Sequence, residues 1–476
     1  MKKLCIVFAV FLLISCFSGC VQGENGKNNK VNPGYSTEIP TYADDQQLEV
    51  LAGWMPPVKE EQYEWMKECG ITAVLVDGKF DSQSGATRRK ILTMCTELDI
   101  DVYFPIDRDH SGSWIKDYEP WLEYPAFAGF YCDEPITKKH IDNIANQAKE
   151  THSLSPDLKM ISNMLSDYSD GGVGYSWIFS NKEDYQAALE DGQFFANYEA
   201  YVAYMQETVL SQYDNVIVSA TNYPLADYNR GYETTLVKTW LKTLGLSMQT
   251  AQAVDKDMWQ FIATTAYHSG GGGFYHRQPT EADIRWMSYT ALAYGAKGIE
   301  EFVYTTVGPG AEFDGDDHGA IWWKDIDNPQ SYYRTDVWYS AQAVHQELFK
   351  FDHVLLSFEW KGVLCHNVTN DASVTPVFEN AVGKLESHKR IEKIDSTHDL
   401  LVGCFEDQNQ YDGFMVVNFT ETAHNSRLPN QVSLTFDYAT KALVYVKGEE
   451  QLVDLTNHTY TCTLLPGEGF FIIPIA

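Results

Sequence analysis

FAGFYC, residues 127–132, is a short apolar run that leads directly into Asp133-Glu134-Pro135. A compact apolar run closed by a proline is typical of a buried strand, because proline ends regular structure and restricts the residue before it. The run therefore predicts a strand with two carboxyl groups at its carboxyl end. The position of that strand among its neighbours decides the fold.

Seven similar runs occur along the chain, separated by amphipathic stretches such as 58–69 and 86–98 that are typical of helices. Eight strands alternating with helices over about 300 residues predict an α/β fold, a parallel TIM or (β/α)8 barrel. A Rossmann sheet is the alternative, but no GxGxxG follows an early strand. The other seven expected strands are Leu48–Trp54, Ile71–Val76, Ile100–Ile106, Leu158–Met164, Asn215–Ala220, Trp259–Ala266 and Gly298–Tyr304.

The pattern changes near residue 361, where short β-rich runs separated by turn residues replace the alternation. LLVGCF, GFMVVNF, QVSLTF, ALVYVKG and GFFIIPI are examples. Such runs predict a C-terminal antiparallel β-sandwich. We therefore expect a barrel domain over 46–360 and a sandwich domain over 361–476.

The first residues are typical of a targeting segment. Lys2 and Lys3 precede an apolar stretch, 4–17, that is too short to span a bilayer. Phe17-Ser-Gly-Cys20 resembles a bacterial lipobox, which implies removal of 1–19 and acylation of Cys20. A plain secretory signal with a chance cysteine is the alternative. We expect 20–45 to be a flexible tether, and the protein to be exported and lipid-anchored at the cell surface, touching the membrane only through the lipid.

The composition limits the classes of molecule that the protein is expected to bind. The chain has 476 residues, 44% of them hydrophobic, and a formal net charge of -31. Nucleic-acid binding requires clustered Lys and Arg, so a nucleic-acid partner is not expected. The cysteines show neither CxxC nor a histidine at metal-ligand spacing, and no metal or cofactor is expected. Some of the 12 Trp and 29 Tyr could stack on sugars.

Catalytic groups of such barrels lie at the carboxyl ends of the strands. The residues there are acidic, aromatic and amide-bearing, with no cationic phosphate clamp, and glycoside hydrolysis needs two carboxyl groups. Glu134 is the proton-donor candidate because the neighbouring Asp133 disfavours its ionisation. A pair that merely caps the helix from Thr137 is the alternative. The candidates for sugar contacts are Trp54, Asp77, Asp107, Asn222, Tyr223, Tyr267 and Tyr304.

GFYCDEP resembles the end of the fourth strand in retaining barrel glycosidases, where the acid/base glutamate is found. Residues 277–285 and 291–299 are similar to the seventh helix and eighth strand of family 42-like glycosidases. The resemblance implies a glycoside hydrolase with Glu134 as acid/base. It also implies that Tyr304 is the aromatic sugar platform at the end of strand eight.

The chain departs from that family at strand seven, where the family has its nucleophilic glutamate. No Asp or Glu lies between Trp259 and Thr280, and Thr264 or Thr265 takes the place. The second carboxylate could come from Glu300 or Glu301 on strand eight. Asp77 or Asp107 could instead activate water in an inverting enzyme. The barrel could also be a sugar binder without catalysis.

Glu300 is preferred, since it shares a strand face with Tyr304 if that tyrosine points inward. The sequence thus predicts a glycoside hydrolase acting on an oligo- or polysaccharide, with Glu134 as general acid, Asp133 orienting it and Glu300 as partner. A noncatalytic carbohydrate-binding surface lipoprotein is the alternative. The oligomeric state is left open.

Overall fold

The structure is a computed structural model of the whole chain. It describes residues 36–76, 84–165, 167, 182–225, 236–268, 275–307, 318–324, 328, 331–420 and 428–476. The expected signal segment with Cys20, most of the tether and Asp77 lie outside the described residues. Within the described ranges, no helix is long and apolar enough to cross a membrane.

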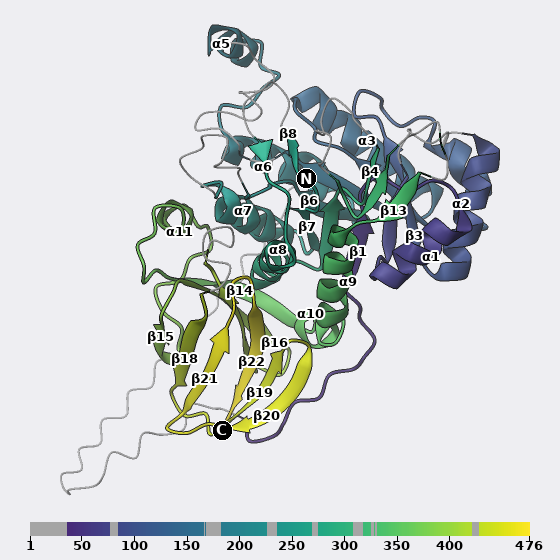
Figure 1. Cartoon of the computed structure of the whole chain (residues 1–476). Helices are drawn as coiled ribbons and strands as arrows, with labels where there is room; N and C mark the ends of the chain where they lie inside the picture. The colour runs from purple at the N-terminus through teal and green to yellow at the C-terminus, as the bar shows by residue number, and fades with distance from the viewer. Residues whose placement is uncertain are drawn as a thin grey trace, which may run out of the picture. The chain divides into compact units, whose positions relative to one another are not determined.

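Eight parallel strands close into a barrel in the order β1-β10-β7-β6-β5-β4-β3-β2 (Figure 1). Each one falls within or next to a strand that the sequence predicts, so the (β/α)8 fold class is confirmed. The strands are β1 (Glu49–Ala52), β2 (Ala73–Leu75), β3 (Asp101–Ile106), β4 (Phe127–Cys132), β5 (Lys159–Met164), β6 (Val216–Ala220), β7 (Met258–Ala263) and β10 (Gly298–Phe302).

Helices connect these strands and cover the outside of the barrel. Several begin at a side-chain cap, as in α8, where Thr280 and Asp283 form a reciprocal capping box. The helices are α1 (Glu60–Cys69), α2 (Gly85–Leu98), η2 (Ile115–Trp121), α3 (Lys138–Leu154), α5 (Lys182–Glu190), α6 (Tyr198–Met205), η3 (Gln206–Leu210), α7 (Trp240–Ala253), α8 (Glu281–Ala293), α9 (Asp336–Leu348) and α10 (Asp352–Leu356).

Aromatic side chains fill much of the barrel interior. The rings of Tyr103 and Trp259 lie 6.2 Å apart, and those of Tyr131 and Phe261 lie 6.3 Å apart, both edge to face. Such pairs stabilise the interior beyond the burial of their area. The interior is therefore a packed core below a polar layer at the carboxyl ends of the strands.

A β-bulge in β4 sets which side chains face that interior. The pairing with β3 shifts by one residue at Ala128. As a result Phe127 and Phe130, three residues apart, both contact Tyr118 on the outer side of the barrel. Gly129 follows the extra residue with φ of 152°, a conformation that favours glycine. The bulge therefore fixes the face on which the next residues of β4 lie.

Short sheets extend the carboxyl ends of β7 and β10. β8 (Tyr267–His268) pairs with β9 (Tyr275–His276), antiparallel. β11 (Thr305–Val307), β12 (Ile321–Trp323) and β13 (Tyr332–Arg334) form a second small sheet. Both sheets follow strands whose ends the sequence marked as candidate site positions.

The C-terminal part is the predicted antiparallel β-sandwich, and β14 crosses the boundary expected at 360/361 (Figure 1). One sheet has the order β14-β16-β17-β22-β19-β20 and the other β15-β18-β21. The elements are β14 (Phe358–His366), α11 (Thr375–Glu379), β15 (Ile391–Ser396), β16 (Leu400–Asp407), β17 (Asp412–Asn418), β18 (Asn430–Phe436), β19 (Lys441–Val446), β20 (Glu449–Asp454), β21 (Thr459–Leu464) and β22 (Gly469–Ile475).

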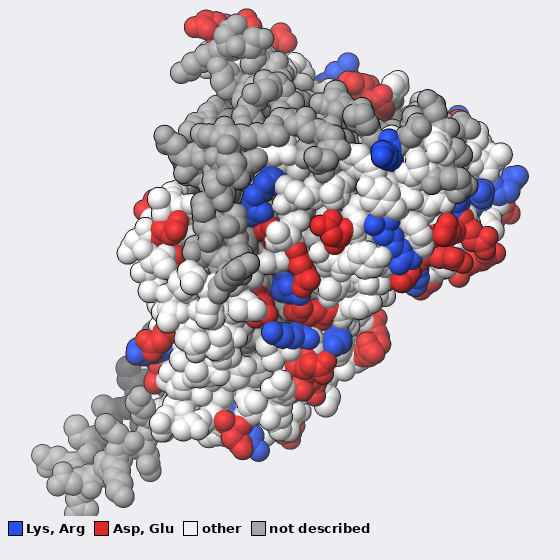
Figure 2. Space-filling view, in the orientation of Figure 1, with Lys and Arg blue, Asp and Glu red and all other residues white. Residues whose placement is uncertain are grey.

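The central strands of the larger sheet, such as β17 and β22, are buried on both faces, which explains their continuous apolar runs. In β17, Phe414 and Val416 join the core between the two sheets, whereas Met415 and Val417 join the core shared with the barrel. Close approach to α8 depends on Gly403, where a Cβ would lie 2.2 Å from the carbonyl oxygen of Ala293. On the face drawn in Figure 2, described acidic and basic side chains are interspersed.

Candidate active site

The predicted acidic pair lies at the carboxyl end of β4, where the chain turns toward α3. Glu134 has a φ of 33°, unusual for a residue with a side chain. Arg108, which follows β3, stabilises this turn: its Nη1 donates to the carbonyl oxygens of Glu134 at 2.5 Å and Asp133 at 3.4 Å. The two carboxyl groups are thus held at the carboxyl end of the barrel strands by the loop that follows the neighbouring strand β3.

Asp133 is exposed as a residue, but one of its carboxyl oxygens is fixed. Oδ1 accepts hydrogen bonds from the Asn163 amide at 2.9 Å and the Tyr131 hydroxyl at 3.2 Å. Asn163 is oriented in turn, because its Oδ1 accepts from Thr221 at 2.7 Å and Ser219 at 3.2 Å. The network joins the ends of β4, β5 and β6 and holds Asp133 as a hydrogen-bond acceptor.

Glu134 is half-buried, and its carboxyl group is largely removed from water. This desolvation, together with the nearby charge of Asp133, raises the pKa of Glu134 to about 8. Arg108 and a hydrogen bond with Thr221 act in the opposite direction and are outweighed. Glu134 therefore carries a proton at neutral pH, as a general acid must.

Glu300 lies on the inner face of β10, fully buried. The Ser219 hydroxyl oxygen lies 2.5 Å from its Oε1, within hydrogen-bond distance, while Oε2 has no hydrogen-bond partner within the described part of the chain. Burial, with a contribution from Asp133, raises the pKa of Glu300 to about 8. Glu300 is therefore a neutral acid at neutral pH, connected to the Asp133 network through Ser219.

Glu301, the other candidate on β10, lies on the outer face. It is fully buried beside His345 of α9, with 3.3 Å between Oε1 and Nε2. Nδ1 of His345 is 2.9 Å from the carbonyl oxygen of Cys69 in α1. The two-residue period of the strand thus separates Glu300 from Glu301, as the sequence predicts, and Glu301 is remote from the barrel interior.

The end of β7 offers no carboxylate, in agreement with the sequence. Thr264 and Thr265 are fully buried there. Their hydroxyls donate to backbone carbonyl oxygens, of Val303 at 3.2 Å and of Ala266 at 3.1 Å. Neither threonine therefore presents a hydroxyl to a ligand in the place of a nucleophile.

An aromatic cluster stands at the ends of β1, β6, β7 and β10. Phe302 is its centre: its ring lies 5.1 Å from both Tyr223 and Tyr267, and 5.5 Å from Trp54. The ring of Tyr267 stacks on His276 at 4.4 Å. Trp54 and Phe302 are partly exposed, whereas Tyr223 and Tyr267 are buried. The cluster brings together three of the residues predicted to contact sugar.

Three other predicted contacts lie elsewhere. Tyr304 is fully buried and accepts a hydrogen bond from Trp338 of α9 at 3.2 Å, so its ring offers no open face to a sugar. Asn222 is also fully buried, and its amide donates to Thr243 of α7 at 2.9 Å. Both side chains face the helix layer. Tyr304 lies beyond the end of β10 and Asn222 beyond the end of β6, so the alternation that places Glu300 on the inner face does not extend to them, and Tyr304 does not share the face of Glu300.

Asp107 is exposed in a turn after β3. Its Oδ1 accepts from the backbone of Asp109 at 2.8 Å, and its Oδ2 lies 3.1 Å from the His110 ring. These local contacts do not connect it to the Asp133 network. A role as the base of an inverting reaction has no support from this placement.

Several polar residues of the site were not expected from the sequence. Asn163 and Ser219 stand in otherwise apolar runs, MISNM and VIVSA, and a polar residue on the inner face near a strand end was the available signal. Arg108 gave no such signal, because its contacts are with another strand. The residues that sequence reasoning missed are Arg108, Asn163, Ser219, Thr221 and Phe302.

Within the described ranges, no group of three or more His, Cys, Asp or Glu side chains could hold a metal ion. The chemistry available at the end of β4 is that of carboxyl groups, hydroxyls, an amide and aromatic rings. Such a set can protonate a leaving group and bind hydroxyl-rich ligands.

No family model and no curated protein matches the sequence. The fold resembles that of a catalytic mutant of a GH42 β-galactosidase from G. stearothermophilus, with a TM-score of 0.52 and 8% identity, over 92% of this chain and 99% of that one. A GH30 endoxylanase from Clostridium papyrosolvens aligns over 92% and 98%, with a TM-score of 0.41 and 9% identity.

A β-galactosidase from Marinomonas aligns over 67% of this chain, with a TM-score of 0.44 and 10% identity. The chain spans 63% of the length of that enzyme. The likeness to the GH42 β-galactosidase, at 8% identity, concerns the fold alone. On that likeness the chain has a glycoside-hydrolase-like fold, a barrel followed by a sandwich.

Proposed function

We propose that this protein is a glycoside hydrolase that cleaves O-glycosidic bonds in an oligo- or polysaccharide, with Glu134 as the proton donor. The observation that carries the proposal is the position of Glu134. Its carboxyl group lies at the carboxyl end of β4 and stands beside the acceptor Asp133, and burial raises its pKa to about 8. The aromatic cluster around Phe302 adds apolar ring surface at the same end of the barrel.

The first test is a screen for glycan hydrolysis by the wild type and Glu134→Gln. Gln is nearly isosteric but cannot deliver a proton, so turnover should fall by about 10²–10⁴-fold. Glu123→Gln is the matched control, since Glu123 is exposed in the loop before β4. Equal turnover by the wild type and Glu134→Gln would remove Glu134 from the mechanism.

The pH profile of kcat/KM provides a second prediction. The raised pKa means that Glu134 keeps its proton below pH 8 and loses it above, so kcat/KM should fall on the alkaline side with an apparent pKa of about 8. Because kcat/KM reports the ionisation of groups in the free enzyme, this pKa is that of Glu134 before substrate binds. An alkaline limb near pH 5, the region of an ordinary carboxyl group, would show that a different residue limits the rate.

A noncatalytic carbohydrate-binding protein is the second candidate. The two buried threonines at the end of β7, where related enzymes are expected to carry a carboxylate, favour it. Saturable binding of an oligosaccharide, unchanged in Glu134→Gln and without product in either protein, would support this second function over the first.

We further propose that the protein is exported and anchored at the cell surface by acylation of Cys20. The support is the sequence Phe17-Ser-Gly-Cys20 after an apolar stretch. Cells fed a labelled fatty acid should label the wild type and leave Cys20→Ser unlabelled. Equal labelling of both proteins, or of neither, would contradict the anchor.

A further inference from the structure

Glycoside hydrolysis needs a nucleophile or an activated water molecule at the anomeric carbon, on the side opposite the leaving group. Two protein carboxyl groups about 5–10 Å apart, across the scissile bond, are the usual solution. Asp133 and Glu134 are consecutive, so their Cα atoms are about 3.8 Å apart and both side chains leave from the same strand end. A partner carboxylate from another strand would be required if the protein supplied the nucleophile.

Among the carboxylates offered for that role, those that the structure describes are committed elsewhere, and Asp77 lies outside the described residues. Glu300 is fully buried, bonded to Ser219 and protonated at neutral pH. Glu301 is buried on the outer face beside His345, and Asp107 takes part in its own turn. With no carboxylate at the end of β7, none of these groups can attack a sugar bound next to Glu134.

The geometry of Asp133 fits a different task. Tyr131 and Asn163 hold its Oδ1, while Oδ2 has no partner within the described part of the chain and the residue is exposed. A fixed carboxylate with a free acceptor oxygen, adjacent to a proton donor, is suited to receive an N–H of a bound ligand. Glu300 Oε2, fully buried and unpartnered among the described residues, adds a second polar group to the same network.

We propose that the substrate is a β-linked 2-acetamido-2-deoxy sugar, whose own acetamido oxygen attacks the anomeric carbon while Asp133 receives the acetamido N–H. This inference rests on the proposed function and names its substrate class. It accounts for an adjacent Asp-Glu pair without a carboxylate on β7, because the nucleophile belongs to the substrate. Substrate-assisted hydrolysis of this kind is a known exception to the two-carboxylate scheme.

Hydrolysis takes two steps, in which Glu134 acts first as acid and then as base. Glu134 gives its proton to the glycosidic oxygen, the bond from C1 to that oxygen breaks, and its electron pair leaves with the alcohol. The acetamido carbonyl oxygen bonds to C1 and forms a cyclic oxazolinium ion, whose N–H and positive charge face Asp133. Water then attacks C1, the bond from C1 to the oxazolinium oxygen breaks to restore the acetamido group, and Glu134 takes the proton of the water.

The stereochemistry follows from the same steps. The acetamido oxygen can reach C1 only from the face opposite the leaving group, so the two substituents must be trans. In sugars with an equatorial acetamido group the linkage is therefore β, and two inversions at C1 give a product that retains the β configuration.

Matched pairs of aryl β-glycosides that differ only at C2 test the proposal with the full-length protein. N-acetylglucosaminides and N-acetylgalactosaminides are compared with the glucosides and galactosides. The acetamido member should have a kcat/KM at least about 100-fold higher, since the positioned acetamido oxygen supplies the nucleophile. Replacing its methyl hydrogens by fluorine weakens that oxygen and should lower kcat progressively.

Asp133→Asn should reduce kcat on the acetamido substrates by about 10²-fold, because an amide cannot balance the oxazolinium charge. Asp117→Asn, at an exposed position in η2, is the matched control. A thiazoline analogue of the oxazolinium ion should inhibit the wild type competitively and bind Asp133→Asn more weakly.

The outcomes separate the two proposals. Hydrolysis of the 2-hydroxy glycosides as fast as the acetamido series, still dependent on Glu134, would overturn the acetamido mechanism and leave the glycosidase proposal standing. No hydrolysis of either series, nor of oligosaccharide mixtures that contain both kinds of sugar, would overturn both.

Discussion

Gly129→Ala is expected to destabilise the protein by more than about 4 kcal/mol, a loss of stability that only a few kinds of substitution cause. An added Cβ would lie 1.9 Å from the carbonyl oxygen of Lys159 and 2.9 Å from its backbone nitrogen. These atoms belong to β5, which cannot move away without breaking its pairing with β4. The φ of 152° at Gly129 adds a cost for any residue with a side chain.

The same substitution should also remove activity from whatever protein folds. The bulge at Ala128 places Tyr131 and Asp133 on the inner face, so a change of register would move the acidic pair away from Asn163 and Thr221. Denaturant titration measures the loss of stability, and Gly85→Ala is the control.

Gly85 begins α2, and its nearest heavy atom to an added Cβ, in Trp121, is 4.0 Å away. Alanine there should leave the stability within about 1 kcal/mol of the wild type. A denaturant midpoint for Gly129→Ala equal to that of Gly85→Ala would contradict the role given to the bulge.

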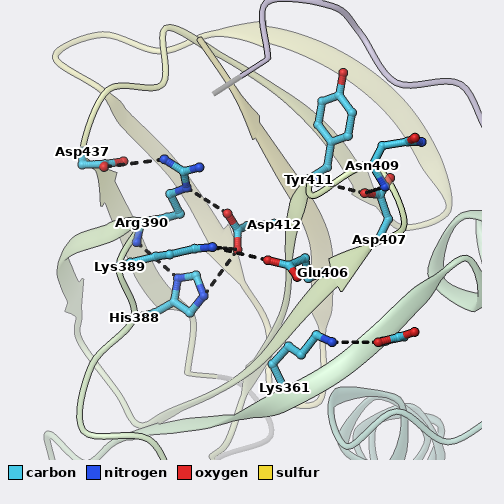
Figure 3. Close-up of polar contacts among 11 residues, drawn as sticks. Lys361, His388, Lys389, Arg390, Glu406, Asp407, Asn409, Tyr411, Asp412 and Asp437 are labelled. Carbon is cyan, nitrogen blue, oxygen red and sulfur yellow. Dashed lines mark hydrogen bonds and ion pairs between the residues drawn. The ribbon is translucent and has the colours of Figure 1, made fainter. Parts of the chain in front are cut away.

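Asp412→Ala is expected to destabilise the β-sandwich by about 3–5 kcal/mol, the usual cost of removing one partner from a buried ion pair. Figure 3 shows Asp412 surrounded by three basic side chains. Its carboxyl oxygens lie 2.8 Å from Nε of Arg390, 3.3 Å from Nζ of Lys389 and 3.6 Å from Nε2 of His388. Asp412 and Arg390 are both buried, so the loss takes a carboxylate away from a buried guanidinium whose charge is little screened.

Lys361→Ala is the control for this second effect. Lys361 pairs with Glu359 at 2.7 Å, but both are exposed, and such surface pairs contribute about 0–1 kcal/mol (Figure 3). Urea unfolding followed by tryptophan fluorescence compares the two variants. Equal midpoints for Asp412→Ala and Lys361→Ala would show that the buried cluster does not stabilise the sandwich.

The barrel could be predicted because its strands are buried on both faces and therefore read as continuous apolar runs. FAGFYC and VIVSA needed no tertiary information, and the acidic pair at the end of the first run was predicted with them. The bulge at Ala128 was not, since nothing local distinguishes an extra residue in a strand from an ordinary one. Gly129 is seen to be required only once the neighbouring strand brings the backbone of Lys159 against it.

The remaining site residues depended on which face of a strand end they occupy. Tyr304 and Asn222 have suitable side chains, yet both turn toward helices α9 and α7. Phe302, two residues before Tyr304, reaches the aromatic cluster instead. Contacts between strands, such as those of Arg108 with the end of β4, join residues far apart in sequence and leave no local pattern.

The most direct test of Glu134 as proton donor is the dependence of kcat/KM on the leaving group, measured for the wild type and Glu134→Gln with aryl glycosides of increasingly acidic phenols. A poor leaving group needs the proton, whereas a dinitrophenolate departs without it. We expect Glu134→Gln to lose about 10²–10⁴-fold with the least acidic phenol and to approach the wild type with the most acidic one. A loss of the same size across the whole series would contradict the assignment of Glu134 as general acid.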